Sequence, residues 1–306
     1  MAPPLIFDRS LLRARRRRGL QLGPETFLLD RVAEDFADRL RVVLRRFDLA
    51  VDIGTPTAAV RAALLRDGAI GAIVAVDPVI DEARNLSGDH AAAVALRVVA
   101  DEEALPFADD SLDLVVSGLA LQAVNDLPGV LVQIRRALKP DGLFVAALLG
   151  GDTLAELRQS FAMAESELDG GVSPRVAPFP DLRDMGSLLQ RAGFALPVTD
   201  ADRVTVRYAT PLALLRDLRR MGAANPLVER RRVPLRRATL MRAMEVYAAR
   251  FADPDGKVRA SFEIIWLSGW SPHESQQQPL RPGSATTRLA DALGTTEIAT
   301  GEKPER

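Results

Sequence analysis

The sequence predicts an α/β protein in which a mostly parallel sheet carries helices on both faces. Two observations support this prediction. Short apolar runs alternate with segments whose apolar residues recur at the period of a helix, and the loops between them are short. Residues 48–58 also run from an apolar strand through a break at Gly54 into a helical pattern, and a second apolar run follows, as in a βαβ unit.

The first half of the chain is predicted to contain most of the parallel sheet. A helical period from Phe27 to Phe47 precedes the first strand. The turn-forming sequence Lys139-Pro140-Asp141-Gly142 predicts a turn before the fifth strand. We expect helices at 58–66 and 127–138, and strands at 48–53, 70–76, 94–100, 112–118 and 143–149.

The second half of the chain is predicted to add two strands and further helices. Thr153 and Glu156 have the spacing of a capping box that would open a helix. The sixth strand is expected to bend at Asp200-Ala201-Asp202. The other helices are expected at 182–192, 212–221 and 240–251, and the last two strands at 198–208 and 260–270.

Composition excludes several kinds of site. The 306 residues are 47% hydrophobic, which is enough for a substantial core. The chain has no cysteine, which excludes disulfides, thiolate nucleophiles and cysteine-ligated metals. With only His90 and His273, no histidine-rich metal site is expected. The net charge of -1 argues against nucleic acid as a partner of the whole molecule.

The sequence also predicts a location and one basic surface. No apolar run reaches the roughly 18 residues of a membrane span, and no signal-peptide core follows the N-terminus. A soluble intracellular protein is therefore expected, cytoplasmic or on the matrix side if it is mitochondrial. The run Arg13-Ala14-Arg15-Arg16-Arg17-Arg18 is interpreted as a solvated basic helix or as a surface for a phosphate-bearing or acidic partner.

The turn at Gly54 is a candidate ligand site. In an open α/β sheet, free backbone N–H groups and the helix dipole at such a turn point at a nucleotide-like ligand. Asp77 ends the second strand, 23 residues after Gly54. An acid at this place can accept both ribose hydroxyls of an adenosine group. Asp77-Pro78 is also compatible with a helix N-cap followed by proline.

Motifs after this turn resemble the body of class I S-adenosylmethionine (SAM) methyltransferases over about 100 residues. They are Asp101 with 105–107, then 110–115, then 138–142. The resemblance implies a Rossmann-like sheet of seven strands in the order 3-2-1-4-5-7-6, with an antiparallel last strand. It implies that Asp101, with Glu102 beside it, faces the adenine amino group. The expected SAM-binding residues are Asp52, Gly54, Asp77, Asp101, Glu102 and Ser117.

Motifs spread over the whole chain narrow the resemblance from this superfamily to one family within it. They are Phe7-Asp8-Arg9, 124–128, 150–154, 173–179, Gly269-Trp270, 273–275 and 281–285. With them, residues 5–290 resemble the NADH:ubiquinone oxidoreductase complex assembly factor 5 family, and the malonyl-carrier-protein O-methyltransferases are a sister group. The resemblance implies a SAM-binding enzyme that hydroxylates an arginine of a complex I subunit, its protein partner.

Two departures from the family pattern fall near the expected cleft. Pro56 and Ala58 stand where the family has glycines, and proline removes an N–H donor and fixes φ. Gln122-Ala123 stands where the family has His-Trp. The polar candidates for catalysis are Asp126, Asp152 and His273, although a lone histidine is more often a surface residue.

Two other functions stay open. A conventional SAM-dependent methyltransferase would act on a carboxylate of a small molecule or a carrier protein, mainly by positioning the nucleophile. A catalytically silent assembly chaperone would keep the fold with a degenerate SAM site. Hydroxylation normally needs a metal or an organic redox cofactor. The sequence shows no pattern of two histidines and one carboxylate, which non-haem iron would favour.

The chain is expected to divide into an N-terminal helical arm, 1–46, a methyltransferase-like domain, 47–282, and a disordered tail, 283–306. A helical cap is expected as an insertion at about 209–257, covering the cleft. Eleven arginines lie between Arg203 and Arg242. They are interpreted as a solvated helical surface or as a docking surface for an acidic protein partner.

Overall fold

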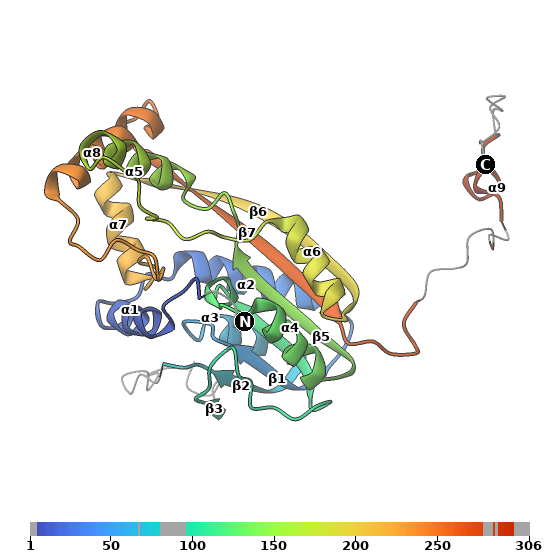
Figure 1. Ribbon diagram of the computed structural model, residues 1–306. Coiled ribbons are helices and arrows are strands. Elements are labelled where there is room, and N and C mark those ends of the chain that lie inside the picture. Colours follow the sequence, from blue (N-terminus) through green and yellow to red (C-terminus); the bar gives the residue numbers. More distant parts are fainter. Residues whose placement is uncertain (1–4, 67, 80–95, 278–283, 285–286, 297–306) are drawn as a thin grey trace. The chain divides into compact units, whose positions relative to one another are not determined.

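Figure 1 shows the computed structural model of the chain, which describes residues 5–66, 68–79, 96–277, 284 and 287–296. His90, most of the 281–285 motif and much of the predicted tail lie outside the described residues. The chain divides into two units, Met1–Pro272 and His273–Arg306. The second unit contains a short helix, α9 (Leu289–Leu293).

A seven-stranded sheet, counted over the described residues, forms the centre of the first unit. Its order is β3-β2-β1-β4-β5-β7-β6, and β7 is antiparallel to both of its neighbours. This confirms the predicted order, including the pairing of β1 with β4. The strands are β1 (Phe47–Ile53), β2 (Ile70–Val76), β3 (Leu96–Val98), β4 (Leu112–Gly118), β5 (Leu138–Leu149), β6 (Ala195–Tyr208) and β7 (Val258–Trp270).

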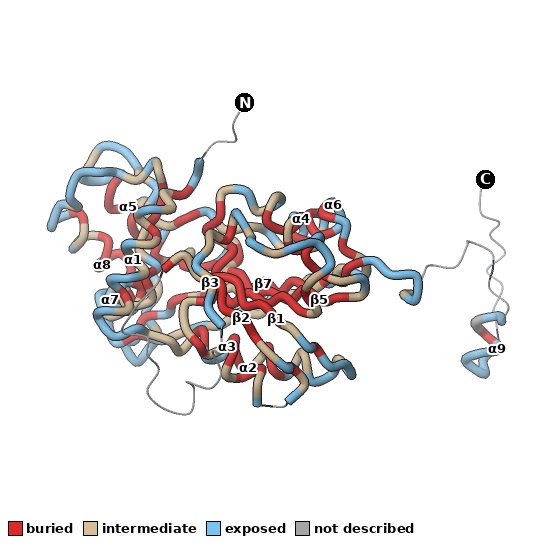
Figure 2. Tube along the Cα trace, turned by 90° about the horizontal axis from the view of Figure 1, so that it is seen from below, coloured by how far each residue is buried: buried red, intermediate tan, exposed pale blue. Residues whose placement is uncertain are grey.

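Helices cover both faces of the sheet, and Figure 2 shows the buried strands between the two layers. Val32 and Phe36, four residues apart, are 0% exposed on one layer, and Val130 and Ile134 are 0% exposed on the other. This spacing gives each helix one apolar face toward the sheet. The first layer is α2 (Phe27–Arg41) and α3 (Ala59–Leu65), and the second is α4 (Leu127–Ala137) and α6 (Leu182–Arg191).

Four further helices gather beyond the carboxyl ends of the parallel strands (Figure 1). They are α1 (Arg9–Gln21), α5 (Ala155–Leu168), α7 (Pro211–Arg220) and α8 (Arg237–Phe251). We call the connection between β6 and β7, residues 209–257, the cap; it contains α7 and α8. α5 packs against α8, and α1 packs against α7. The α1–α7 contact is close, since a Cβ at Gly19 would lie 2.6 Å from the carbonyl oxygen of Arg220.

One predicted helix cap is wrong. Thr153 and Glu156 form no capping box, because α5 begins after Leu154, at φ +55°, without a side-chain cap. The Thr153 hydroxyl instead donates to the carbonyl oxygen of Glu263 and accepts from its N–H. Glu156 accepts from the N–H and the hydroxyl of Ser261. Both side chains therefore fasten α5 to β7, a contact that local spacing cannot show.

The predicted turn at 139–142 is part of a strand. β5 begins at Leu138, and its pairing with β4 shifts register between Leu138 and Leu143. Asp141, at φ +64°, lies inside this shift. The turn-forming residues therefore make a bulge rather than a break, because the residues on both sides find partners on β4.

The predicted bend in the sixth strand lies elsewhere. β6 pairs with β7 without interruption from Val198 to Tyr208, so a bend at 200–202 is wrong. The register shift lies between Ala195 and Val198, where Leu196 has φ +49°.

Two glycine-to-alanine substitutions in helices should change stability in opposite directions. Alanine normally stabilises a helix interior relative to glycine by roughly 0.5–1 kcal/mol. Gly186→Ala in α6 should show this gain, because the new Cβ would meet nothing closer than Thr199 Oγ1 at 3.5 Å. Gly19→Ala should instead cost about 1–3 kcal/mol, since its Cβ would press on the backbone of Arg220 and Gly222. Urea unfolding of the two variants measures the difference, and a stabilised Gly19→Ala would contradict the close α1–α7 contact.

Candidate functional site

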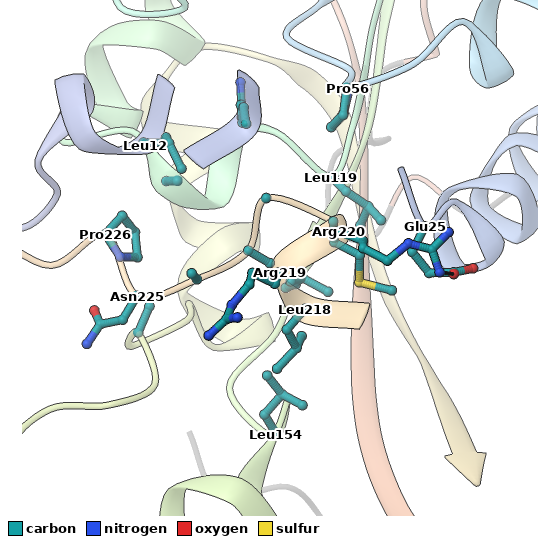
Figure 3. A pocket seen from close by; sticks show the side chains of 18 of the residues that line it. Leu12, Glu25, Pro56, Leu119, Leu154, Leu218, Arg219, Arg220, Asn225 and Pro226 are labelled. Atoms are coloured by element: carbon teal, nitrogen blue, oxygen red, sulfur yellow. Dashed lines mark hydrogen bonds and ion pairs between the residues drawn. The ribbon is translucent and has the colours of Figure 1, made fainter. Parts of the chain in front are cut away.

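A cavity of about 390 Å³ lies at the carboxyl ends of the parallel strands. Pro56 and Thr57 after β1, Asp77 and Val79 after β2, and Leu119 after β4 form its wall on the sheet side. This is the edge at which open α/β sheets bind ligands. Residues of α1, of α7 and of the segment that follows α7 close the other side (Figure 3).

Most of the cavity wall is apolar. Leu12 of α1, Leu28 of α2, Leu154 before α5 and Leu218 of α7 all line it. Its volume falls within the roughly 300–1,000 Å³ of small-molecule sites. Polar groups on such a wall interact strongly with a bound ligand, because little water screens them.

Asp77 lies on the cavity wall at the end of β2. Its Oδ1 accepts a hydrogen bond from the N–H of Val79 at 2.8 Å, which fixes the direction of the carboxylate. Of the six predicted cofactor residues, all of which the structure describes, Asp77 is the one that lines this cavity. Its role in binding ribose stays a prediction.

Asp52, Gly54 and Ser117 lie in a buried network behind the wall. Asp52 is 0% exposed and is bound by the guanidinium of Arg61 and the hydroxyl of Thr55. The Gly54 N–H donates to the carbonyl oxygen of Val76, and the Ser117 hydroxyl donates to that of Ile53. These groups tie the carboxyl ends of β1, β2 and β4 together. They are therefore engaged with the protein itself rather than directed into the cavity.

Asp101 and Glu102, after β3, are bound by three arginines of α1. Asp101 pairs with Arg9 and Arg13, and Glu102, which is 0% exposed, pairs with Arg9 and Arg16. The spacing of the arginines, at i, i+4 and i+7, places them on one face of the helix. The predicted adenine-binding acids are thus engaged by an element about 90 residues earlier in the sequence.

These contacts change the pKa of Asp101. Burial disfavours its charged form, but the N–H of Glu103 and the guanidiniums of Arg9 and Arg13 outweigh burial and lower the pKa. Because the pKa of Asp101 in the folded protein lies below the unfolded value of about 3.9, its ionised carboxylate stabilises the fold at neutral pH. This stabilisation of the fold is lost as the pH falls through the lowered pKa of Asp101 in the folded protein.

The interpretation of Arg13–Arg18 as a solvated helix is wrong for two of its arginines. The Arg16 side chain is only 10% exposed and binds Glu102, and Arg13 binds Asp101. Arg17 and Arg18 are exposed, and within the described chain they have no ion pair.

The structure places the three candidate catalytic side chains in different surroundings. Asp126 caps α4 by accepting from the N–H of Gly129 at 2.9 Å. Asp152 is exposed and pairs with Arg203 on β6. His273 belongs to the second unit, where its Nδ1 lies 2.7 Å from the Ser275 hydroxyl. Neither Asp126 nor Asp152 is among the residues of the described chain that line the cavity.

Charged groups on the cap side of the cavity are the functional candidates that the sequence did not indicate. Glu25, between α1 and α2, pairs with Arg220 of α7 at 2.8 Å, and both line the cavity. Arg175 also lines it and pairs with the buried Glu165. Arg219 is exposed, and no described residue forms a hydrogen bond or ion pair with its side chain. In the sequence, only the run of arginines in the cap indicated that charged groups would lie near the cavity.

Most of the eleven arginines between Arg203 and Arg242 serve the protein itself. Seven form ion pairs, for example Arg231 and Arg236 with Asp169 at the α5–α8 contact. The four without an ion pair to any described residue are Arg216, Arg219, Arg232 and Arg237. The positive charge open to a partner is therefore much smaller than the sequence suggests.

The described residues contain neither a candidate metal site nor a candidate membrane span. No three His, Asp or Glu side chains among them are grouped so that they could hold a metal ion. None of the described helices combines the length and the apolar character needed to cross a bilayer.

Solved structures confirm the fold. The 1,6-didemethyltoxoflavin-N1-methyltransferase of Burkholderia thailandensis, solved with S-adenosylhomocysteine, has a TM-score of 0.51 at 16% identity over 89% of this chain and 94% of its own. The YcgJ protein of Bacillus subtilis has a TM-score of 0.51 at 14% identity over 78% of this chain and 98% of its own. At such low identity, these likenesses establish a shared architecture.

Sequence comparisons establish the family. Residues 51–146 match a methyltransferase domain model. Malonyl-[acyl-carrier protein] O-methyltransferase of Xylella fastidiosa is 36% identical over 72% of this chain and 73% of its own. Mitochondrial arginine-hydroxylase NDUFAF5 of Homo sapiens is 40% identical over 94% of this chain and 83% of its own, and that of Danio rerio is 38% identical over 94% and 89%. The chain therefore belongs to the NDUFAF5 family within the methyltransferase-fold enzymes.

Proposed function

We propose that this protein binds SAM at the carboxyl edge of its sheet and hydroxylates an arginine of a complex I subunit, on the matrix side where the setting is mitochondrial. The single observation that carries the proposal is its similarity to arginine-hydroxylase NDUFAF5 over 94% of the chain. A span of this length includes the cap, which lines the cavity, as well as the shared sheet. Similarity confined to the sheet would support SAM binding without supporting the substrate.

The cavity supports this proposal through what its residues can bind and exclude. Asp77 would hold the ribose of SAM, because its carboxylate lies on the wall at the end of β2. Bound SAM would supply a sulfonium, which carries its net positive charge, and a zwitterionic methionine end. Hydroxylation places one oxygen atom on a C–H bond, so the oxygen donor and the electrons come from co-reactants. The chain itself would orient the arginine and keep bulk water out with its apolar wall.

SAM would meet competition from α1. Both oxygens of Asp101 accept hydrogen bonds from arginines, and those of Glu102 do so as well. An adenine amino group at Asp101 would have to share an oxygen with an arginine or displace that arginine. SAM is itself cationic at its sulfonium, so the α1 arginines also repel it through space. We therefore expect weak binding, and Pro56, which offers no N–H to the ligand, weakens it further.

Methyl transfer to a carboxylate is a second candidate, and one specific observation favours it. Arg219 on the cavity wall has no ion-pair partner among the described residues, and a guanidinium is well suited to bind a carboxylate. The malonyl-[acyl-carrier protein] O-methyltransferase relatives are named for a substrate with such a group. Conventional in-line positioning of that carboxylate would suffice for the reaction.

Intact-mass spectrometry of the partner subunit distinguishes the two reactions. The subunit is isolated from cells with and without this protein. Hydroxylation predicts that the subunit is lighter by about 16 mass units in the deletion, and methyl transfer to a carboxylate of the subunit predicts that it is lighter by about 14, because the modification adds one oxygen or one methylene. An unchanged mass together with failed complex assembly would instead show a binding module that keeps the fold.

Titration calorimetry with SAM tests the cofactor assignment. Pro56→Gly should tighten binding by about one to two decades, because it restores one N–H donor worth roughly 1.5–3 kcal/mol to a charged ligand. Asp77→Ala should abolish binding, because the ribose loses its acceptor. The assignment fails if Asp77→Ala binds SAM as wild type does, or if wild type shows no binding at millimolar SAM.

The α1 arginines should compete measurably with SAM. Arg13→Gln should tighten SAM binding about three- to tenfold, because it frees one oxygen of Asp101 and removes a nearby positive charge. Arg17→Gln is the matched control, since Arg17 is exposed on the same helix and has no ion pair to a described residue. Weaker binding by Arg13→Gln would mean that the arginine supports the cofactor instead of competing with it.

A further inference from the structure

We infer that Glu25 is the residue that receives the guanidinium of the target arginine. This inference rests on the proposed hydroxylation, and it assigns a substrate-binding role to an acid that the sequence did not single out. It follows from the acids that line the cavity, from the contacts of the Glu25 carboxylate and from the placement of the neighbouring arginines.

A guanidinium needs a carboxylate in a wall as apolar as this one. An isolated charge is costly away from water, whereas an arginine–carboxylate pair is among the strongest hydrogen-bonded pairs. Two acids of the described chain line the cavity, Asp77 and Glu25. Asp77 lies at the end of β2, where the proposed function uses it for the ribose. Glu25 is therefore the acid that remains for the substrate.

The Glu25 carboxylate has room for a second guanidinium. Its Oε2 accepts from Nη1 of Arg220 at 2.8 Å, and among the described residues its Oε1 has no donor. The side chain is 24% exposed, so a ligand can reach it. A carboxylate offers about four lone-pair sites. A substrate arginine can therefore bind Oε1 while Arg220 stays on Oε2.

Arg220 acts as a positioning residue for Glu25. Its Nε donates to the carbonyl oxygen of Gly23 at 2.7 Å, while its Nη1 holds the carboxylate. This bridge joins α7 of the cap to the segment between α1 and α2, and it fixes the carboxylate on the cavity wall. Figure 3 shows the two side chains facing each other.

The placement of Arg219 makes the two sides of the cavity differ in charge. Figure 3 shows that the side chain of Arg219 extends toward Asn225, away from the pair formed by Arg220 and Glu25. Arg219 has no acidic partner among the described residues, so it repels a guanidinium from its side of the cavity. An arginine side chain is thus directed to the Glu25 side, whereas a carboxylate would be drawn to Arg219.

The test compares two blocked amino acids, N-acetyl-arginine amide and N-acetyl-citrulline amide, which have nearly the same shape and differ in charge. Ligand-detected NMR on the full chain measures both affinities. Wild type should prefer the arginine probe about tenfold or more. Glu25→Gln should lose this preference, Glu25→Asp should keep part of it, and SAM affinity should stay unchanged in both.

Glu34→Gln is the matched control. Glu34, on α2, also pairs with an arginine at 2.8 Å, but its side chain is 65% exposed and it does not line the cavity. This variant should keep the preference for the arginine probe. In cells, Glu25→Gln should lower the fraction of the subunit that carries the added oxygen, and Glu34→Gln should not.

The outcomes separate the two proposals. A wild-type protein that binds both probes equally, or neither at about 10 mM, would overturn the arginine substrate and the role of Glu25 with it. A wild type that prefers arginine, beside a Glu25→Gln variant that prefers it equally, would overturn the role of Glu25 alone. Unchanged thermal unfolding and SAM affinity in Glu25→Gln exclude misfolding as the cause of a lost preference.

Discussion

The ion pairs between α1 and the loop after β3 are the interaction on which the closed cavity depends. Glu102 is fully buried, and a buried carboxylate without partners is strongly destabilising. α1 in turn buries little apolar surface, with Leu12 and Gly19 as its buried residues. Arg9 and Arg16 therefore have two effects. They neutralise Glu102, and they hold a polar helix against the edge of the sheet.

The same N-terminal segment also joins the sheet to the cap. The backbone of Phe7 pairs with Leu227 after α7, and the N–H of Phe7 donates to the side chain of Asn125 after β4. At the other end of α1, Gly19 lies against Gly222 with no space for a Cβ between them. The cavity is the space enclosed where these three parts meet. Its shape depends on contacts that are far apart in the chain, and a displacement of α1 would open it.

Charge inside the protein follows a consistent pattern. The chain has 40 basic and 41 acidic side chains, and arginines form most of the ion pairs that tie separate elements together. An arginine suits this role because its planar group can bind two acceptors at once. Since so many charges are satisfied internally, the few that stay open on the cavity wall determine what it can bind. On different sides of the cavity, Arg219 has no ion pair to a described residue, and Glu25, although paired with Arg220 through Oε2, has no donor on Oε1 among the described residues.

Sequence alone determined most of the helices and strands along the chain. β2 spans Ile70–Val76 as predicted, because an apolar run bounded by turn residues has few other ways to fold. The end of that run also placed Asp77 at the ligand edge of the sheet. The strand order came from the resemblance to a known family, and the structure confirmed it.

Only the tertiary structure decided which side chains meet. Glu25 and Arg220 are 195 residues apart, and Arg9 and Asp101 are 92 apart. Thr153 and Glu156 likewise bind β7 although their local spacing favours a helix cap. Hydrophobic periodicity and turn chemistry act over a few residues, so they can be found in one segment at a time. An ion pair between distant segments depends on the packing of every element between them, and no local pattern records it.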